Sequence, residues 1–468
     1  METKITLINT PVRLAWDASF FPIGLAYIAT FIERSGREIE ILDFNLTRPT
    51  DGEAEEMLIK SKPRYVGITG MAIQYGLIRK YAHMAKQRLP GVTVIVGGRV
   101  TAVPELIMNN PDIDVAVMGD GEDTINELLT CLDKGDDLKK VRGIAYRDEK
   151  GEIVQNPLRS FEANLDRLGV PNYELFNVDQ YIENQKKTHS HRGGVGKRSL
   201  NMISTRGCPF HCSFCGEDRD NLRRRSISGI IREIGWLKDR YNINHVHFSD
   251  GLFFNSRKRV HEFCDALDAS GLGITWSGNG RVDIVTPELI DRVMKSGCNL
   301  IAYGFESGSP EMLKAMNKTT TVEQNMRTVQ IHRERNLPFA TSMILGARGE
   351  NYKTLYQTWI FLMKTCFTPS SINYMMIYPG TPDWYYALSN GRITNLTKYM
   401  DRMAAEVSSA RYSDKKLLVN ISNLSDRQLY WAGVFVKYTL RLRLKLADYG
   451  IGSALRRFAR VFTRKKTP

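Results

Sequence analysis

Short apolar runs alternate with amphipathic stretches over the first 140 residues of this chain. The apolar runs are rich in β-branched residues and the stretches between them have helical periodicity, a pattern typical of parallel strands joined by helices. Strands are expected at residues 4–10, 38–45, 65–71, 92–98 and 115–122, and helices at residues 22–36, 74–89 and 102–110. We therefore predict an α/β domain over residues 1–140, with a doubly wound, Rossmann-like sheet.

The same alternation returns after residue 200. Further strands are expected at residues 200–205, 245–250, 274–279, 300–307, 339–346 and 371–379, with helical stretches between them. Six β/α units favour a partial, TIM-like (β/α)6 barrel over residues 200–395, with functional groups at the carboxyl ends of the strands. Residues 141–199 are predicted to form a hairpin and a linker, and residues 396–468 a basic helical region.

Glycines end several of the strands predicted in the N-terminal domain. Gly70, the pair Gly97 and Gly98, and the pair Gly119 and Gly121 each follow an apolar run. Ligands of doubly wound sheets lie beyond the carboxyl ends of the strands, where glycine lets the backbone approach a ligand closely. A tight turn explains any one of these glycines, but three such positions at the same edge of the sheet favour a ligand site.

Three of the seven cysteines, Cys208, Cys212 and Cys215, lie within eight residues. Their spacing is unusual for zinc, although a zinc site that includes His211 remains an alternative at this point. Three thiolates on one short loop suit three irons of a 4Fe-4S cluster, which leaves the fourth iron open to another ligand. The other cysteines are expected to be buried single thiols.

The composition limits where the protein works. The N-terminus has no basic segment followed by an apolar one, and an odd number of cysteines does not suggest a disulfide framework, so we expect a cytoplasmic protein. No run of 18 apolar residues occurs, so no spanning helix is predicted. With 42% hydrophobic and 25% charged residues, the chain can bury a sizeable core.

Most of the net charge of +14 lies at the C-terminus. Residues 437–468 contain one acid, Asp448, and ten basic residues: Lys437, Arg441, Arg443, Lys445, Arg456, Arg457, Arg460, Arg464, Lys465 and Lys466. Basic amphipathic helices of this kind bind membrane surfaces, which would make the protein peripheral to a membrane. The alternative is that apolar residues of this region pack onto the barrel, namely Trp431, Phe435, Leu442 and Leu446.

The cysteine triplet, with the aromatic Phe214 before the third cysteine, resembles the signature of radical S-adenosylmethionine (radical SAM) enzymes. The resemblance extends to "GFESGS" (304–309), "LGARGE" (345–350) and "YPGTPDWYY" (378–386), although Ala347 and Arg348 depart from the usual motif. It implies a 4Fe-4S cluster held by the three cysteines and S-adenosylmethionine bound to the open iron. The SAM contacts that it implies are Phe214, Asp250, Arg281, Glu306 and Gly346.

Residues 22–45 and 94–129 are similar to the cobalamin (B12)-binding domain that precedes the barrel in one branch of that family. Arg99 directly follows the paired glycines, where the branch often has Pro-His, and the D-x-H-x-x-G motif of other cobalamin proteins is absent. The resemblance implies bound cobalamin. The implied contacts are Thr69, Gln74, Tyr75, Gly97, Gly98, Arg99, Gly119, Gly121 and Glu122.

For the function, the resemblance implies a C-methyltransferase in which a 5′-deoxyadenosyl radical removes hydrogen from an unactivated carbon and methylcobalamin supplies the methyl group. An oxidative cyclisation or rearrangement without methyl transfer is the alternative, and a non-enzymatic iron–sulfur sensor is a third reading. The expected partners are a small-molecule, lipid or peptide substrate and an electron donor such as flavodoxin or ferredoxin. No nucleic acid is expected as a partner.

Overall fold

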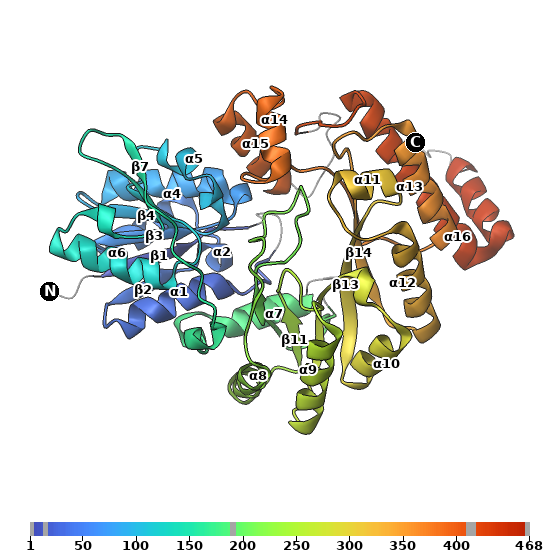
Figure 1. Cartoon of the computed structure of the whole chain (residues 1–468), viewed down its shortest axis with the longest axis horizontal. Coiled ribbons are helices and arrows are strands. Elements are labelled where there is room, and N and C mark those ends of the chain that lie inside the picture. The colour runs from blue at the N-terminus through green and yellow to red at the C-terminus, as the bar shows by residue number, and fades with distance from the viewer. Residues whose placement is uncertain (1–3, 13–16, 188–192, 409–417, 464–468) are drawn as a thin grey trace.

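The computed structural model describes residues 4–12, 17–187, 193–408 and 418–463. Two sheets lie side by side, the first formed by the N-terminal part of the chain and the second by its middle, and helix α16 lies on the side of the second sheet away from the first (Figure 1). Both sheets are mainly parallel and have helices packed on them. The predicted α/β architecture, a doubly wound domain followed by a partial barrel, is confirmed.

The first sheet has the strand order β2-β1-β3-β4-β5-β6-β7. Its five parallel strands all fall within predicted strands: β1 (Ile5–Asn9), β2 (Ile39–Leu42), β3 (Tyr65–Thr69), β4 (Thr93–Gly97) and β5 (Val115–Val117). The chain moves from β1 to β2 on one side and then to β3 on the other, which makes a topological switch point between β1 and β3. A ligand is expected outside the strand ends at such a point.

The helices of this domain are partly those expected from the sequence. The predicted ones are α1 (Ile23–Arg34), α4 (Tyr75–Arg88) and α5 (Pro104–Met108), and those that sequence reasoning missed are α2 (Phe44–Thr47), α3 (Asp51–Ser61) and α6 (Glu122–Lys134). A capping box between Thr50 and Glu53 starts α3, which is the kind of signal that could have identified it. The fifth strand was expected to reach residue 122, but β5 ends earlier and α6 begins there.

The hairpin expected after residue 141 extends the first sheet. Its strands, β6 (Ile144–Arg147) and β7 (Ile153–Gln155), pair antiparallel with each other, and β6 pairs with β5. The rest of this segment carries helix α7 (Val178–Lys187). Short 3-10 turns complete the domain and its connections: Ala72–Gln74, Arg99–Ala102, Leu138–Lys140, Leu165–Leu168, Tyr173–Leu175 and, in the barrel, Val282–Ile284.

The second sheet has six parallel strands in the order β15-β14-β13-β12-β11-β8. They are β8 (Ser199–Met202), β11 (His245–Phe248), β12 (Thr275–Gly280), β13 (Cys298–Glu306), β14 (Phe339–Leu345) and β15 (Ser371–Tyr374). Because β15 and β8 stand at the two edges and do not pair, the sheet is a partial barrel. The helices that follow its strands are α8 (Ile227–Tyr241), α9 (Arg257–Ala269), α10 (Pro287–Lys295), α11 (Pro310–Ala315), α12 (Val322–Arg335) and α13 (Tyr352–Thr365).

In the described part of the chain after the barrel, the helices are α14 (Pro382–Ser389), α15 (Leu396–Ser408) and α16 (Asp426–Thr463). Helix α15 returns to the first domain and packs on α4, where Asp401 lies 3.5 Å from Arg79. Helix α16 packs on α13 instead. Among the described residues, no helix combines the length and apolar character needed to cross a bilayer.

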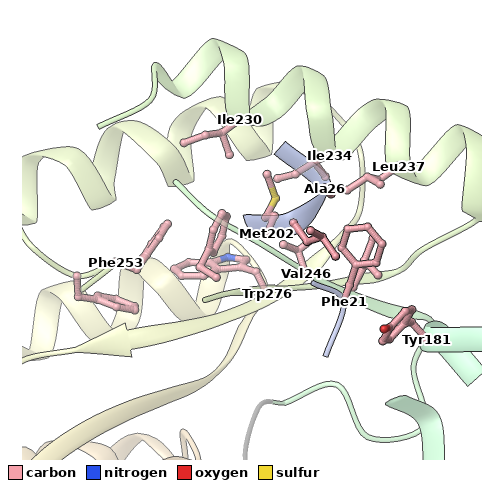
Figure 2. Close-up of a cluster of buried hydrophobic side chains, with 14 of the residues drawn as sticks. Phe21, Ala26, Tyr181, Met202, Ile230, Ile234, Leu237, Val246, Phe253 and Trp276 are labelled. Carbon is pink, nitrogen blue, oxygen red and sulfur yellow. The ribbon is translucent and has the colours of Figure 1, made fainter. Parts of the chain in front are cut away.

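The two domains share one hydrophobic core. Figure 2 shows Phe21 and Ala26, from the N-terminal domain, beside Met202, Val246 and Trp276 of the barrel strands. Two hydrogen bonds reinforce this junction, since the side-chain amide of Asn201 donates to the Phe21 carbonyl at 3.0 Å and accepts from the Phe21 N–H at 2.9 Å. Burial of these side chains therefore fixes how the first sheet sits against the second.

Candidate cofactor site

A cavity of about 800 Å³ lies between the two domains. Its wall includes Thr69 and Gly97, at the carboxyl ends of β3 and β4, and Asp120, just after β5. The barrel contributes Ser249, which follows β11, and Cys215 of the cysteine loop. The cavity thus lies at the switch-point edge of the first sheet, and its volume is near the upper end of the range usual for ligand sites.

The cysteine loop begins and ends in a short antiparallel pair, β9 (Thr205–Arg206) and β10 (Arg223–Arg224). Within the loop, the N–H of Cys208 donates to the carbonyl of Asp218 at 2.8 Å. Gly207 has a φ of +75°, and a Cβ added there would lie 2.1 Å from the carbonyl oxygen of Asn221. Only glycine therefore lets the two arms of the loop come this close.

Contacts with the barrel hold the middle of the cysteine loop. The Ser213 N–H donates to the Met316 carbonyl at 2.9 Å, and its hydroxyl donates to Asp383 Oδ2 at 2.8 Å. The amide of Asn317 donates to the His211 carbonyl at 2.8 Å. The loop is therefore fixed between the residues that follow α11 and the start of α14.

The three thiols fit an iron–sulfur cluster. Burial raises the pKa of Cys208 and of Cys215, and the neighbouring thiol of Cys212 raises both further. These surroundings disfavour the deprotonated form of the thiols, whereas a positively charged metal group stabilises that form. The loop provides three sulfur ligands and no fourth cysteine, which is the donor set for a cluster with one open iron.

The zinc site with His211 is not formed in the described part of the chain. There, no three His, Cys, Asp or Glu side chains converge on a point that suits a single metal ion. His211 is largely exposed, and its Nε2 lies 2.6 Å from Asp220 Oδ1. Thiolates that bind separate irons of one cluster do not have to converge on one ion, so this geometry is compatible with the cluster.

Among the predicted SAM contacts, Asp250 lies in the cavity wall. It is 1% exposed, and burial raises the pKa of its carboxyl group, which accepts a hydrogen bond from the Ser204 N–H at 2.6 Å. The side-chain amide of Asn279 donates to its carbonyl at 2.8 Å. Asp250 thus joins the ends of three neighbouring barrel strands beside the cavity.

Phe214 belongs to the cysteine loop and Arg281 lies next to it, but neither is in the wall of the cavity. The guanidinium of Arg281 stacks over the ring of Phe210, with its central carbon 3.4 Å from the ring centroid, and donates to the Thr319 hydroxyl at 2.8 Å. Phe214 is half-buried and packs against buried apolar side chains. Both residues therefore help to place the loop, whatever else they contact.

Glu306 ends β13 in a left-handed conformation with a φ of +61°, which is uncommon for a residue other than glycine. Its carboxylate accepts from Lys318 Nζ at 3.1 Å and from the Ser342 hydroxyl at 3.3 Å. It folds back over Gly304, where a Cβ would lie 2.0 Å from Oε1. Lys318 follows Asn317, which contacts the cysteine loop, so Glu306 is connected to that loop.

Gly346, the last predicted SAM contact, ends β14 with a φ of +88°. Its N–H donates to the carboxylate of the buried Glu350. A Cβ at this position would lie 2.6 Å from the Leu429 side chain, because α16 packs closely over this strand end. Gly346 and Glu306 both lie outside the wall of the cavity described above.

The predicted cobalamin contacts mostly do line the cavity: Thr69, Gly97, Gly98, Arg99, Gly119, Gly121 and Glu122. A Cβ added at Gly97 or Gly119 would have no protein atom within 4 Å, so the backbone there faces open space. At Gly98, with a φ of +91°, a Cβ would lie 2.7 Å from the Gly70 carbonyl oxygen. The glycines thus form a broad wall without side chains, which suits a large flat ligand.

Gln74 and Tyr75 do not line the cavity. Gln74 is buried, and its amide donates to the carbonyl and the hydroxyl of Thr10 at 2.6 and 2.7 Å. The Tyr75 hydroxyl donates to the Leu106 carbonyl at 3.4 Å. In this arrangement both side chains stabilise the strand ends behind the cavity.

Arg99 connects the first domain to the cysteine loop. Its guanidinium donates to the Gly216 carbonyl at 2.5 Å, to Glu217 Oε2 at 2.9 Å and to Asp218 Oδ1 at 3.1 Å. The position where this sequence departs from the usual Pro-His is therefore the one that reaches across to the loop. No sequence pattern within the first domain predicts this contact.

Other residues of the wall were not predicted from the sequence. Arg206 pairs with Glu122 and lies 3.3 Å from Asp120, and neighbouring carboxylates raise its pKa although burial opposes the shift. The Ser249 hydroxyl is buried in the wall and has no hydrogen-bond partner among the described residues, which fits a bound polar ligand. Its place before Asp250, at the end of a predicted strand, is a signal that could have identified it.

Comparisons with known proteins identify the two domains that line this cavity. The radical SAM superfamily model matches residues 202–361, and the B12 binding domain model matches residues 12–129. An uncharacterized methyltransferase of Pyrococcus horikoshii is 30% identical over 80% of this chain and 80% of its own length. The anaerobic magnesium-protoporphyrin IX monomethyl ester cyclase of Rubrivivax gelatinosus is 28% identical over 76% of this chain and 64% of its own length.

Two solved structures share the fold. OxsB, a cobalamin-dependent S-adenosylmethionine radical enzyme, has a TM-score of 0.66 and 20% identity, and the match covers 86% of this chain and 56% of OxsB. The radical S-adenosylmethionine methyltransferase TsrM of Kitasatospora setae, with cobalamin and a 4Fe-4S cluster bound, also has a TM-score of 0.66 and 20% identity. That match covers 83% of this chain and 75% of TsrM.

The chain therefore belongs to the radical SAM superfamily. Its N-terminal domain is a B12-binding domain, so within the superfamily it is one of the cobalamin-dependent members. It is an enzyme whose cofactors are a 4Fe-4S cluster, S-adenosylmethionine and cobalamin. Enzymes of this superfamily act on small molecules and need a reductant.

Proposed function

We propose that this protein is a C-methyltransferase that acts on an unactivated carbon atom. The observation that carries the proposal is the cavity of about 800 Å³, because glycine-rich strand ends of the B12-binding domain and Cys215 of the cluster loop line the same space. When bound, the cluster and S-adenosylmethionine supply radical chemistry and cobalamin supplies a methyl group. A space shared by both cofactor regions suits a reaction that uses both on one substrate.

In this reaction the protein holds the two cofactor regions at a fixed distance from each other. Ser213 anchors the cysteine loop to the barrel, and Arg99 joins the same loop to the end of β4. Because the two domains also share a core, the distance between the loop and the glycine wall is set before any substrate enters. Such positioning is a large part of what a protein contributes to cofactor chemistry.

We further propose roles for the individual residues. Cys208, Cys212 and Cys215 ligate the cluster; Phe214, Asp250, Arg281, Glu306 and Gly346 contact S-adenosylmethionine; and the glycine wall with Arg99 binds cobalamin. The left-handed backbone at Glu306 and the unpartnered hydroxyl of Ser249 support a ligand beside these strand ends. Gln74 and Tyr75 are proposed to support the glycine wall from the side that faces away from the cavity.

Oxidative cyclisation or rearrangement is the second candidate function. The resemblance to the magnesium-protoporphyrin IX monomethyl ester cyclase of Rubrivivax gelatinosus, at 28% identity, favours it. The methyltransferases of Pyrococcus horikoshii and, at 24% identity, of Streptomyces wedmorensis favour methyl transfer. The cavity itself is compatible with both.

Methyl transfer is tested without knowledge of the substrate. The protein is reconstituted without oxygen with iron, sulfide and cobalamin, and is then given dithionite and S-adenosylmethionine that carries a deuterated methyl group. We expect about four irons and one cobalt per chain, 5′-deoxyadenosine as a product, and cobalamin that carries the deuterated methyl group. Iron with 5′-deoxyadenosine but no label on cobalamin would favour the cyclase, and the triple Cys→Ala variant at 208, 212 and 215 is the control for cluster binding.

We propose a small-molecule, lipid or peptide substrate and a one-electron donor such as flavodoxin or ferredoxin. The reducing cytoplasm is the proposed location, because the cysteines of the described chain are unpaired thiols and a cluster with an open iron needs a reductant.

A further inference from the structure

Helix α16 has apolar side chains on two opposite faces. Leu429, Val436 and Leu440 are at most 3% exposed and pack against the barrel and α13. At 3.6 residues per turn, a second stripe falls on the opposite side of the helix. Its residues are exposed by 41 to 58%: Trp431, Phe435, Tyr438 and Leu442.

The exposed stripe continues over the neighbouring helix α13. The ring of Phe435 lies 5.8 Å from that of Trp359, and the ring of Trp359 lies 5.6 Å from that of Tyr356, measured between centroids. Trp359 Nε1 also donates to the Thr439 hydroxyl at 2.9 Å, which holds the two helices together. We define the aromatic surface as these exposed and half-buried side chains: Tyr352, Tyr356, Trp359, Trp431, Phe435, Tyr438 and Leu442.

The sequence left open whether Trp431, Phe435 and Leu442 pack onto the barrel. The structure shows that other residues of α16 occupy the packed face, while these three are 41 to 54% exposed and, of the three, Phe435 contacts Trp359 at the edge of α13. Leu446, the fourth residue of that alternative, has a side chain outside the described residues. A contiguous exposed apolar surface on a folded protein usually marks an interaction site.

Positive charge accompanies the aromatic surface. Arg441, Arg443 and Lys445 are exposed on the same part of α16 as Leu442. The sequence from residue 437 to the C-terminus has ten basic residues and one acid. A partner that matches this surface in charge and polarity carries negative charge as well as apolar groups.

We propose that the aromatic surface and the basic residues of α16 dock the enzyme on an anionic lipid bilayer. Trp, Tyr and Phe are the residues that favour the boundary between lipid headgroups and acyl chains, where a ring is buried while its polar atom stays hydrated. Lys and Arg beside them bind anionic headgroups. With no described helix suited to crossing a bilayer, the contact is peripheral.

A second copy of this chain fits the surface poorly. A two-fold interface would place the same patch of both copies together, and the arginines and lysine of one α16 would then face those of the other. Like charges in such a position oppose association. An acidic protein or a nucleic acid would satisfy the charge, but neither explains the row of exposed aromatic and apolar side chains.

The test is binding of the full-length, cofactor-loaded enzyme to lipid vesicles. The vesicles contain either phosphatidylcholine alone or phosphatidylcholine with about 30% phosphatidylglycerol, and bound protein is measured by flotation. We expect at least tenfold tighter binding to the anionic vesicles, with a loss of binding as salt screens the charges. The variant Trp431→Gln/Phe435→Gln/Tyr438→Gln and the variant Arg441→Gln/Arg443→Gln/Lys445→Gln should each bind at least tenfold more weakly.

A matched pair of single variants controls for exposure. Tyr438 and Tyr385, which lies on α14 outside the aromatic surface, are both 58% exposed. Tyr438→Gln should weaken binding and Tyr385→Gln should not, while both keep the melting temperature because neither side chain is buried. Equal effects of the two single variants would overturn the proposal.

Three other results would also overturn it: absence of vesicle binding by the unchanged enzyme, unchanged binding by the triple aromatic variant, or an aromatic surface that forms a dimer or binds RNA but not vesicles. Vesicle binding is measured without turnover. Failure of the membrane contact is therefore distinguishable from failure of the proposed methyl transfer.

Discussion

Two adjacent glycines in the cavity wall, Gly97 and Gly98, are glycines for different reasons: one leaves space for a ligand, and the other is required by the backbone fold. Gly97 has a backbone conformation open to other residues, and a Cβ there would meet no protein atom within 4 Å. Its neighbour Gly98 has a positive φ and is in close contact with Gly70. The absence of a Cβ therefore keeps the cavity wall open at Gly97 and allows a tight turn at Gly98.

The variant Gly97→Ala should fold normally but load cobalamin at least tenfold more weakly, because the added methyl group projects into the space of the ligand. Gly98→Ala should instead lower the free energy of unfolding by about 1–3 kcal/mol, from backbone strain and the contact with Gly70. Gly52→Ala, on the exposed side of α3, is the control and should be neutral or slightly stabilising. Cobalt content and thermal unfolding are the measurements, and normal cobalamin loading of Gly97→Ala would contradict the assignment of the wall.

Arg99 offers a second prediction for one residue. Because it contacts Gly216, Glu217 and Asp218 next to Cys215, the variant Arg99→Gln should release iron to a chelator severalfold faster than the unchanged protein. Its side chain is 45% exposed, so the loss in unfolding free energy should stay within about 1 kcal/mol. Arg240→Gln, which breaks an exposed pair with Glu174, is the control and should leave iron release unchanged.

Among the elements, the turn between β14 and α13 contains a carboxylic acid whose state depends on pH. Glu350 is 1% exposed, and burial raises its pKa to about 7 although the N–H groups of Gly346 and Ala347 oppose the shift. The pKa of this carboxyl group is 4.5 in the unfolded chain and about 7 in the folded protein. Between these two pH values the folded protein therefore holds a proton at Glu350, and the unfolded chain does not. Stability contributed by this group is present below pH 4.5 and is lost as the pH rises to 7.

The variant Glu350→Gln removes this pH dependence. Relative to the unchanged protein, its free energy of unfolding should rise by up to about 3 kcal/mol between pH 5 and pH 8, since one pKa unit corresponds to about 1.4 kcal/mol. The comparison is between the slopes of the unfolding free energy against pH in the two proteins. Its absolute value is not compared, because burial of the glutamine amide lowers the stability of the variant by the same amount at every pH. Thermal unfolding across this pH range measures it, with the exposed Glu149→Gln as the control; parallel curves would show that Glu350 does not titrate in this range.

For the protein as a unit, buried ion pairs join the B12-binding domain to the barrel. Arg206 of β9 pairs with Glu122 of α6, and their side chains are 16% and 6% exposed. Asp120 contacts Arg206 and also Arg223 of β10. These charges lie around the cavity, so they couple the position of the cysteine loop to the domain that lines its other side.

Replacing Glu122 by Gln leaves Arg206 with only part of its compensating charge. We expect a loss of about 3 kcal/mol in the free energy of unfolding, measured by urea denaturation, because removal of one partner leaves a buried charge uncompensated. Cobalamin loading should fall as well. Glu38→Gln, which breaks an exposed pair with Lys4, should cost less than about 1 kcal/mol, and a similar loss in both variants would refute the role of the buried pair.

Local patterns were sufficient for the strands and for the cysteine triplet, and the cofactor class was implied by the family resemblance that those motifs carry. Periodicity and spacing are properties of short segments, so the apolar runs that became β1, β3 and β4 and the thiols of one loop can be recognised without knowledge of their neighbours. Helix α6 was missed because its residues directly follow a strand and a glycine turn. Its amphipathic pattern was hidden by the expectation that the strand continued.

The tertiary structure decided which of these residues meet. Arg99 reaches Glu217 and Asp218 across more than a hundred residues, Gln74 turns to Thr10 rather than to the cavity, and Phe435 stays exposed. Each outcome depends on how the two sheets and α16 dock on one another. Docking is set by the burial of side chains from distant segments, which no periodicity within one segment encodes.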